Sequence, residues 1–403
     1  MRRLSPETAN AWEQRELGEV ASNFEYGLNA SAKEFDGKNK YIRITDIDDE
    51  SRMFLSDDIT SPDTDLTLAD KFKLEVGDIL FARTGASVGK TYLYREKDGL
   101  VYYAGFLIRA KINSENDAEF VFQNTLTDSY NSFIRITSQR SGQPGVNAQE
   151  YQDYNFYVPN LEEQKAIGTY FRNLDHLITL HQRKYDKLVK VKKSMLEKMF
   201  PKNGSKFPEI RFKGFTDAWE QRELGEMGQT YTGLSGKTKE DFSHGDAKFV
   251  TYMNVFSNPV AEKSMTEPIE IDIKQNKVKY GDVFFTTSSE TPEEVGMSCV
   301  WLENDDNTYL NSFCFGYRPS EIIDPFYLAY MLRSENVRKN ITFLAQGISR
   351  YNISKNKMME ISIPIPSLAE QDKIGTYFRS LDTLITLHQR KPNQKNDGGI
   401  LLC

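Results

Sequence analysis

The segment Gly85–Thr91, GASVGKT, has the composition of a phosphate-binding loop and is the feature of this sequence closest to an enzyme motif. Such a loop needs four residues between its first glycine and its Gly-Lys pair, and it opens a helix whose N-terminus faces the phosphate. Here three residues separate the two glycines, and the following TYLYRE has the pattern of a strand. The segment therefore predicts an exposed turn carrying Arg83, Ser87 and Lys90, and it disfavours a nucleotide site.

Other catalytic chemistry has little support in the sequence. An adenine methylase would carry an Asn-Pro-Pro-aromatic tetrad, but Asn258 and Pro259 are followed by Val260. His181 and His388 lie on an apolar helical stripe, where a packed histidine is commoner than a base or a ligand. The three cysteines show no C-x-x-C spacing, and with four histidines they favour neither a zinc site nor a disulfide framework. We therefore expect no catalytic residue, no metal and no cofactor on this chain.

Two polar loops, residues 141–147 (SGQPGVN) and 347–352 (GISRYN), carry side chains suited to reading DNA. Arginine pairs with guanine and asparagine or glutamine with adenine in the major groove, while serine, threonine and tyrosine suit phosphate contacts. The alternative is that both are ordinary polar loops, but each precedes the last predicted strand of its half of the chain, which favours recognition. The candidate DNA-binding residues are Arg83, Thr84, Ser87, Lys90, Arg140, Ser141, Gln143 and Asn147 in the first half, and Thr287, Ser288, Ser289, Ser349, Arg350, Tyr351 and Asn352 in the second.

An internal repeat dictates the elements that must position these residues. Residues 164–184 read QKAIGTYFRNLDHLITLHQRK, and residues 371–391 read QDKIGTYFRSLDTLITLHQRK. The same shift of 207 residues relates AWEQRELGE at 11–19 to identical letters at 218–226. A repeat this close predicts two domains built on one plan, and 403 residues are enough for each to bury a core. The ends of the copies agree while their middles diverge, which predicts one scaffold carrying two different surfaces.

Hydrophobic patterns place the remaining elements. In the first copy they predict strands at 41–47, 79–83, 91–94, 100–110 and 154–158 and a helix at 118–137. In the second copy they predict strands at 249–256 and 283–286 and a helix at 326–333.

A long helix follows each copy. Asn160 with Glu163 has the spacing of a capping box, and Ser367 with Glu370 repeats it. The first helix continues for about forty residues, about 60 Å at 1.5 Å per residue, until Pro201. Its apolar residues form two stripes, which predicts a coiled-coil seam and a second partner. The candidate docking residues are Tyr170, Phe171, Leu174, Leu177, Ile178, Tyr185 and Leu188, with Phe378, Leu381 and Ile385 in the second copy.

The formal net charge of −7 argues against DNA binding by the chain alone. Residues 183–213 hold eleven basic residues against three acidic ones, which composition alone assigns to a solvated helix face. No apolar run approaches the roughly 20 residues that span a bilayer. The N-terminus has no apolar segment of a secretory signal, so we expect a cytoplasmic protein with no membrane partner.

Several of these motifs together resemble the DNA-specificity (S) subunit of type I restriction-modification systems. They are the repeated AWEQREL start, the GDILFARTG and GDVFFTT strands, the SGQPGVN and QGISRYN loops, and the entries VPNLEEQ and IPIPSLAEQ into the GTYF helix. The resemblance covers nearly the whole chain. It implies a mixed α+β fold with two tandem target recognition domains, separated by long helices that form an antiparallel coiled coil with a pseudo-twofold.

The resemblance also implies how the chain is divided. The expected parts are an N-terminal extension (1–10), target recognition domain 1 (11–160), a first spacer helix (161–201), a linker (202–217), target recognition domain 2 (218–366), a shortened second spacer helix (367–391) and a disordered tail (392–403). The second helix pattern stops at Pro392, and residues 392–403 hold no counterpart of Tyr185–Phe200.

The function implied is non-catalytic. Each domain would read one half of a split sequence in double-stranded DNA, and the helices would set the spacing and dock two methylase (M) subunits, which restriction (R) subunits join. S-adenosylmethionine, ATP and magnesium would be bound by those partners and not by this chain. Two alternatives remain open: a tandem-repeat scaffold whose divergent loops bind proteins, and an ATP-using enzyme built on GASVGKT.

Overall fold

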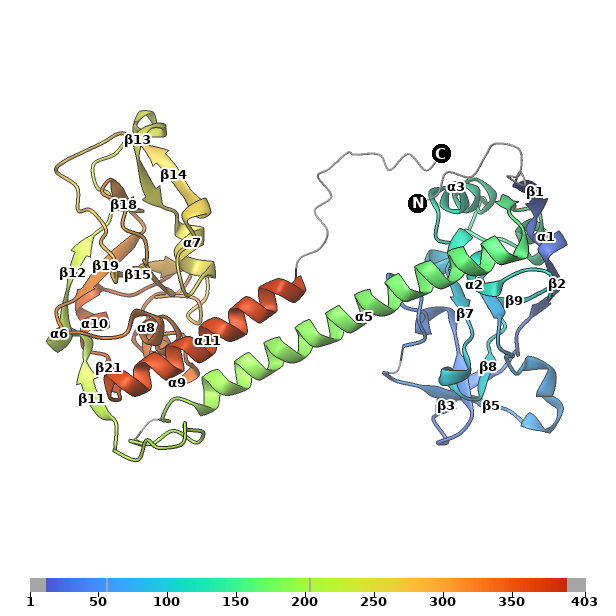
Figure 1. Cartoon of the computed structure of the whole chain (residues 1–403), viewed down its shortest axis with the longest axis horizontal. Coiled ribbons are helices and arrows are strands. Elements are labelled where there is room, and N and C mark those ends of the chain that lie inside the picture. The colour runs from blue at the N-terminus through green and yellow to red at the C-terminus, as the bar shows by residue number, and fades with distance from the viewer. Residues whose placement is uncertain (1–11, 56, 203, 390–403) are drawn as a thin grey trace. The chain divides into compact units, whose positions relative to one another are not determined.

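The computed structural model describes residues 12–55, 57–202 and 204–389. The expected N-terminal extension (1–10) and disordered tail (392–403) lie outside the described residues. The chain divides into two compact units, residues 1–181 (unit 1) and 182–403 (unit 2), so the boundary falls within the long helix α5 (Leu161–Lys198). Each unit is a mixed α+β structure (Figure 1).

Unit 1 is built on a four-stranded antiparallel sheet in the order β2-β9-β6-β7. A second four-stranded sheet, β3-β5-β4-β8, contains the parallel pair β4–β8, and β1 pairs with β10. The strands are β1 (Glu13–Glu16), β2 (Ala21–Tyr26), β3 (Ser31–Glu34), β4 (Lys40–Ile42), β5 (Thr60–Asp63), β6 (Asp78–Ala82), β7 (Thr91–Leu93), β8 (Val101–Tyr103), β9 (Leu107–Ile112) and β10 (Asn155–Val158). The helices are α1 (Leu17–Val20), α2 (Ala118–Asn124), α3 (Asp128–Thr137) and α4 (Ala148–Gln152).

Unit 2 repeats this plan with the central sheet in the order β12-β19-β15-β17. The parallel pair recurs as β13–β18, and β11 pairs with β21 as β1 pairs with β10. The strands are β11 (Glu220–Glu223), β12 (Gly228–Thr232), β13 (Phe242–Val250), β14 (Thr266–Ile269), β15 (Val283–Thr286), β16 (Ser288–Ser289), β17 (Ser298–Val300), β18 (Thr308–Leu310), β19 (Cys314–Pro319), β20 (Tyr351–Asn352) and β21 (Ser362–Ile365). The helices are α6 (Leu224–Met227), α7 (Tyr252–Ser257), α8 (Pro325–Met331), α9 (Glu335–Leu344), α10 (Lys355–Met359) and α11 (Leu368–Gln389).

Several predicted elements are shorter than expected because a polar side chain caps a new element. The strand expected at 41–47 ends at Ile42, and a 3-10 turn follows in which the Asp46 carboxylate accepts the backbone N–H of Arg43 (2.9 Å). The strand expected at 249–256 ends at Val250, because the Thr251 hydroxyl caps α7. The helix expected at 118–137 is two helices, since Thr127 caps α3, and 100–110 is two strands joined by a turn.

A buried glutamine joins each long helix to its domain in the same way. The side-chain oxygen of Gln164 accepts the N–H of Asp117 (3.0 Å), and its amide donates to the carbonyl of Pro159 (2.9 Å). Gln371 makes the two corresponding bonds in unit 2 at 3.0 and 2.8 Å. Asp117 is itself the N-cap of α2, so the glutamine links the start of α5 to the start of another helix.

A glycine one turn later allows the helices to approach this closely. A Cβ on Gly168 would lie 2.5 Å from a carboxylate oxygen of Asp117, and one on Gly375 would lie 2.7 Å from that of Asp324. The glutamine and the glycine together explain why the motif Q-x-x-I-G-T-Y-F occurs in both copies: each is needed for the same helix crossing.

The predicted cap of α5 is confirmed in part, and the prediction for α11 is wrong for Glu370. Asn160 accepts the N–H of Glu163 (3.0 Å), as a cap should. Glu370, expected to complete a capping box with Ser367, instead pairs through both carboxylate oxygens with Arg211 at 2.7 and 2.8 Å. Its side chain is buried, so the arginine of the linker supplies the charge that burial requires.

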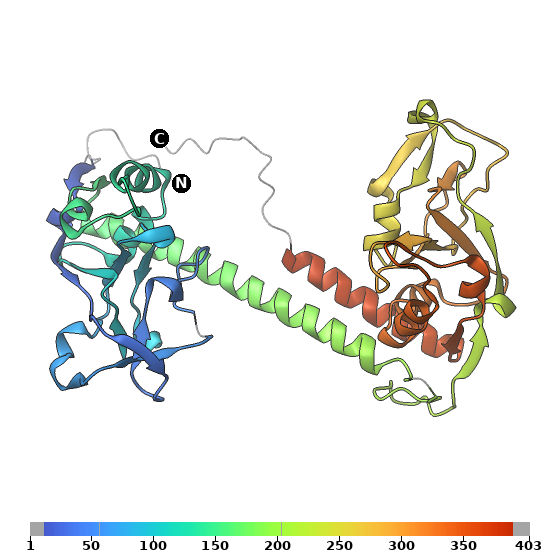
Figure 2. The ribbon, with the colours of Figure 1, turned by 180° about the vertical axis from the view of Figure 1, so that it is seen from behind.

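The antiparallel packing of the helices is confirmed within unit 2. Figures 1 and 2, drawn from opposite sides, both place the C-terminal part of α5 beside α11. Lys192 forms an ion pair with Asp382, and the ring of Phe200 stacks on that of Phe378 with centroids 5.8 Å apart. Residue numbers rise along one helix as they fall along the other, which makes the pair antiparallel.

The residues of the predicted docking stripe therefore differ in burial between the two units. Leu188 packs against the unit 2 core, in which Phe378 and Leu381 are buried, while Tyr185 and Ile385 are half-buried. The remaining members of the stripe are exposed on unit 1: Tyr170, Phe171, Leu174, Leu177 and Ile178.

Candidate nucleic-acid interface

In each unit, three segments that are distant in sequence lie side by side and are joined by backbone hydrogen bonds. In unit 1 the N–H of Arg83 donates to the carbonyl of Phe106 (3.1 Å), and the N–H of Val146 donates to the carbonyl of Arg83 (2.9 Å). We call the set of residues 83–87, 104–107 and 140–147 the unit 1 strip. The structure thus brings together the two groups of candidates that the sequence placed at 83–90 and 140–147.

Unit 2 has the corresponding arrangement, the unit 2 strip, made of residues 287–289, 311–314 and 346–353. The N–H of Thr287 donates to the carbonyl of Phe313 (3.0 Å), and the N–H of Ile353 donates to the carbonyl of Thr287 (3.0 Å). Strands β16 and β20 extend this contact, with Ser288 opposite Asn352. The same backbone frame therefore presents different side chains in the two units.

The glycines of GASVGKT serve the turn between β6 and β7. Gly85 and Gly89 have φ of 72° and 83°, and a Cβ on Gly89 would lie 2.6 Å from Ile134. Residues 85–87 form a 3-10 turn, and Thr91 begins strand β7 instead of a helix. The segment therefore lacks the helix N-terminus that a phosphate-binding loop requires.

Lys90 and Arg83 are less exposed than the sequence suggested. The Lys90 ammonium pairs with the Asp49 carboxylate at 2.5 Å, and its side chain is largely covered. The guanidinium of Arg83 lies over two rings, 5.0 Å from the centroid of Tyr26 and 5.6 Å from that of Phe106. Both cations are held by neighbours, so the prediction of a freely exposed turn is wrong for them.

A hollow of 550 Å³ opens beside Arg83 in unit 1. Its walls include Tyr26, Arg43, Thr45 and Phe106, so it combines aromatic faces with cationic and hydroxyl groups. Arg43 is oriented by two bonds from its guanidinium to Asp46, at 2.9 and 2.8 Å. Such a lining suits the edges of bases and the sugar-phosphate backbone.

Two candidates of the SGQPGVN loop hold the loop itself. The guanidinium of Arg140 donates to both carboxylate oxygens of Glu150 (2.5 and 2.6 Å) and to the carbonyls of Thr137 and Gln139. Asn147 caps α4, with its side-chain oxygen accepting the N–H of Glu150 (3.0 Å). The sequence signal for Asn147 was present, since Glu150 stands three residues later, as in a capping box.

The other candidates differ in how free their side chains are. Ser289 is buried and donates to Glu294 (3.1 Å), the hydroxyl of Thr287 donates to the carbonyl of Phe313 (2.8 Å), and Tyr351 packs against the unit 2 core. Apart from Asn147 and Asn352, whose side chains bond to the backbone, four candidates among the described residues are exposed and form no ion pair: Ser141, Gln143, Ser349 and Arg350. Thr84, Ser87 and Ser288 are half-buried within the strips, and Asn352 is exposed.

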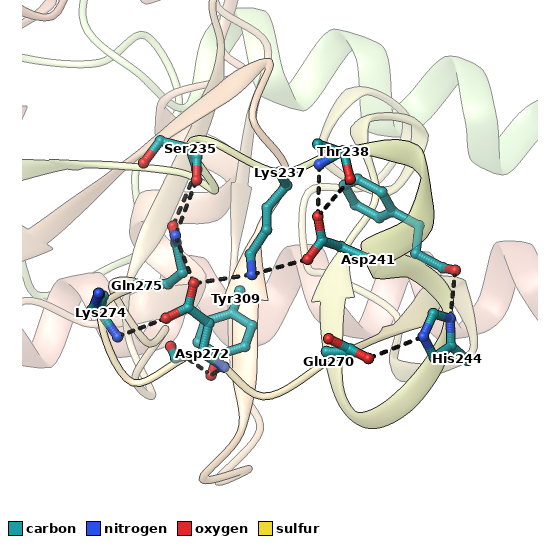
Figure 3. A network of polar contacts seen from close by, with 11 residues as sticks. Ser235, Lys237, Thr238, Asp241, His244, Glu270, Asp272, Lys274, Gln275 and Tyr309 are labelled. Atoms are coloured by element: carbon teal, nitrogen blue, oxygen red, sulfur yellow. Dashed lines mark hydrogen bonds and ion pairs between the residues drawn. The ribbon is translucent and has the colours of Figure 1, made fainter.

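A second polar cluster lies in unit 2, between the loop before β13 and the loop after β14 (Figure 3). The Lys237 ammonium bridges Asp272 (2.9 Å) and Asp241 (3.5 Å), and this contact lowers the pKa of Asp272 to about 2. His244 bonds to Glu270 (3.1 Å) and to the Phe242 carbonyl, and those bonds raise the pKa of its imidazole. The cluster holds two loops together, with Asp241 and Asp272 sharing the Lys237 ammonium and Glu270 bonded to His244.

The described residues contain no group of three or more His, Cys, Asp or Glu side chains that could hold a metal ion. In the same part of the chain, no helix is both long enough and apolar enough to cross a membrane.

Sequence reasoning named Tyr351 but missed the two phenylalanines of the strips. Phe106 and Phe313 occupy the same place in the two units and are 55% and 61% exposed. The signal that could have found them is the repeat shift of 207 residues, which relates these two phenylalanines within otherwise divergent segments.

Comparison with known proteins places this architecture in a family. The family model described as the type I restriction modification DNA specificity domain matches residues 10–190 and again residues 216–395. The putative type I restriction enzyme MjaX specificity subunit of Methanocaldococcus jannaschii is 25% identical over 407 residues, which cover 95% of this chain and 89% of that protein. The MjaVIII specificity subunit of the same organism is 25% identical over 344 residues, covering 79% and 75% of the two chains.

A solved structure shares the fold. The S subunit of a type I restriction-modification system from M. genitalium superposes with a TM-score of 0.52 at 14% identity, over 96% of this chain and 93% of that one. The same domain model thus matches twice, once on each of the two units of like topology. The chain belongs to the type I restriction-modification DNA specificity family.

Proposed function

We propose that this chain is the DNA-reading subunit of a type I restriction-modification complex, in which each unit reads one half of a split target through its strip. The observation that carries the proposal is the pair of strips, which share one backbone frame and differ in almost every side chain. A protein that reads two different half-sites needs that combination of constant frame and variable surface. The chain would be non-catalytic, in keeping with a family that recognises DNA.

The charges of the strips indicate that other subunits contribute to DNA binding. The net charge of the chain is −7, and Arg140 and Lys90 already pair with carboxylates. Affinity for DNA depends mainly on cations that neutralise phosphates, so strips with few unpaired cations need partners that supply more of them. We propose that two methylase subunits, later joined by restriction subunits, supply that grip, and that S-adenosylmethionine, ATP and magnesium bind to those partners.

The exposed stripe on unit 1 is the proposed docking surface for a methylase subunit. Its members are large apolar side chains on one helix, a type of exposed patch that marks protein interfaces: Tyr170, Phe171, Leu174, Leu177 and Ile178. We expect Leu174→Asp to abolish the methylase complex while the chain stays folded, because Leu174 is exposed. Pull-down with a tagged methylase subunit measures this, and the exposed Leu68→Ala is the control. Wild-type assembly by the Leu174 variant would reject the docking role.

Selection from a randomised duplex pool tests the DNA reading. The chain with its methylase subunit should enrich a sequence with two defined parts and an undefined spacer. Arg350→Ala should weaken or relax one part and leave the other unchanged, and Arg140→Ala should do the converse. A wrong base pair typically costs about 1–3 kcal/mol. Equal losses at both parts would rule out modular reading, and enrichment of no sequence would favour the alternative of a protein-binding scaffold.

A further inference from the structure

Phe106 and Phe313 sit at the third position of two turns with the same construction. The first turn, Ala104–Leu107, joins β8 to β9, and the second, Asn311–Cys314, joins β18 to β19. Each turn is closed by a bond from its fourth N–H to its first carbonyl, at 2.8 Å in unit 1 and 3.1 Å in unit 2. The phenylalanine is thus placed by the backbone and not by a side-chain pocket.

Both turns are held from behind by a glycine. A Cβ on Gly27 would lie 2.2 Å from the carbonyl oxygen of Ala104, and one on Gly233 would lie 2.1 Å from that of Asn311. The first residue of each turn also donates its N–H to a neighbouring strand, Ala104 to Ile42 (3.0 Å) and Asn311 to Val250 (3.1 Å). Contacts this close leave the turns little room to move.

The surroundings of the two rings differ. Arg83 covers one face of the Phe106 ring, whereas its counterpart Thr287 bonds only to the backbone of Phe313. Single exposed apolar residues are common on proteins and need no explanation. A phenylalanine that is more than half exposed at the same point of two otherwise divergent surfaces does need one, because neither ring packs into a hydrophobic core of its unit.

We propose that Phe106 and Phe313 are matched apolar wedges, each pressing into a base step of one half-site. Proteins that deform DNA use phenylalanine for this purpose, and a ring on a rigid turn loses little entropy when it inserts. The proposal rests on the proposed function, since it assumes that the strips face DNA. It deepens that function by separating a shared positioning contact from the variable polar contacts that select bases.

The test uses the chain in complex with its methylase subunit and the duplex that the wild-type complex selects. Phe106→Ala and Phe313→Ala should each weaken binding at least about tenfold, the size expected for loss of one stacked base. 2-Aminopurine placed in turn at each position of a half-site should brighten with wild type at one step, where the base unstacks. That signal should vanish for the variant of the matching unit and persist for the other variant.

Matched variants separate this role from a structural one. Leu68→Ala and Ile322→Ala remove apolar side chains outside the strips that are even more exposed than the two phenylalanines, and these variants should bind DNA as wild type does. Phe106→Trp, which keeps a large ring, should retain binding. All variants should melt at the wild-type temperature, since the rings are exposed.

Three outcomes would overturn the proposal. If wild type selects a split target but both alanine variants bind it normally, the wedge role is wrong and the proposed function stands. If the variants lose the methylase subunit in the absence of DNA, the rings contact protein instead. If wild type selects no sequence at all, the proposed function fails and the wedge role with it.

Discussion

The repeated helix segments 164–184 and 371–391 have nearly the same sequence but not the same burial. Phe171 is 43% exposed, whereas the equivalent Phe378 is fully buried. The tryptophans of the repeated AWEQREL motif show the same difference between the units, since Trp12 is 43% exposed and Trp219 is 1% exposed. Identical residues of the repeat are therefore buried to different extents, and the cause of the difference must lie outside the repeat.

The cause is the segment 182–213, which only unit 2 contains. Phe200 stacks on Phe378 and contacts the ring of Trp219 (6.5 Å), and the guanidinium of Arg211 lies 5.9 Å from the same indole ring. In unit 1 the indole N–H of Trp12 donates instead to Glu163 (3.3 Å) at the surface. Among the described residues, the apolar face of the repeated helix is therefore covered in unit 2 and exposed in unit 1.

Truncating the equivalent residues Phe171 and Phe378 should give the largest difference in stability between the two units. Phe378→Ala should cost about 3–5 kcal/mol of unfolding free energy, because it leaves a cavity in the unit 2 core. Phe171→Ala should change the free energy of unfolding by no more than about 0.5 kcal/mol, since its ring is exposed. Urea unfolding of the two variants measures both. Similar losses would show that unit 1 is covered in solution.

A second pair of variants should lose similar amounts of unfolding free energy in the two units. Gly168→Ala and Gly375→Ala both force a Cβ against a carboxylate at a helix crossing, so each should cost about 1–3 kcal/mol. Urea unfolding followed by fluorescence, from Trp12 in unit 1 or from Trp219 and Trp301 in unit 2 with the tryptophans of the other unit replaced by phenylalanine, assigns each loss to its unit. If the substitution in either unit left the free energy of unfolding unchanged, the two helix crossings would not share one geometry.

The smallest expected effect concerns a feature that unit 2 has and unit 1 lacks. The bonds of His244 to the Phe242 carbonyl and to Glu270 raise the pKa of the imidazole above its ordinary value of 6.5. Because the folded pKa is the higher one, the stabilisation is fully present below pH 6.5 and is lost as the pH rises through the folded value. NMR titration of His244 should show the raised pKa, and Glu270→Gln should lower it. An unchanged pKa in that variant would exclude the carboxylate as a cause.

Much of the fold could be read from the sequence because it depends on local chemistry. The repeat, the Gly-Asp turns before β6 and β15, and the cap at Asn160 act over a few residues. The misplaced boundaries, at Ile42, Val250 and 125–127, are points where a hydroxyl or carboxylate side chain captured a backbone N–H. Apolar periodicity does not report that competition.

The candidate interface was harder to read, because its parts meet only through tertiary contacts. The polar loops were recognisable by composition, but the pairing of Arg140 with Glu150 and of Lys90 with Asp49 depends on how the chain returns to itself. The exposure of Phe106 and Phe313 likewise follows from the glycines packed behind their turns.

The sequence by itself determined the duplication, the family and the split between constant helices and variable surfaces, because identical letters at a fixed shift need no coordinates to be recognised. Only the tertiary structure decided which of the two nearly identical helix segments is buried, since burial is a property of what packs against a residue. Segment 182–213 supplies that packing to α11. The same stripe of apolar residues is exposed on unit 1.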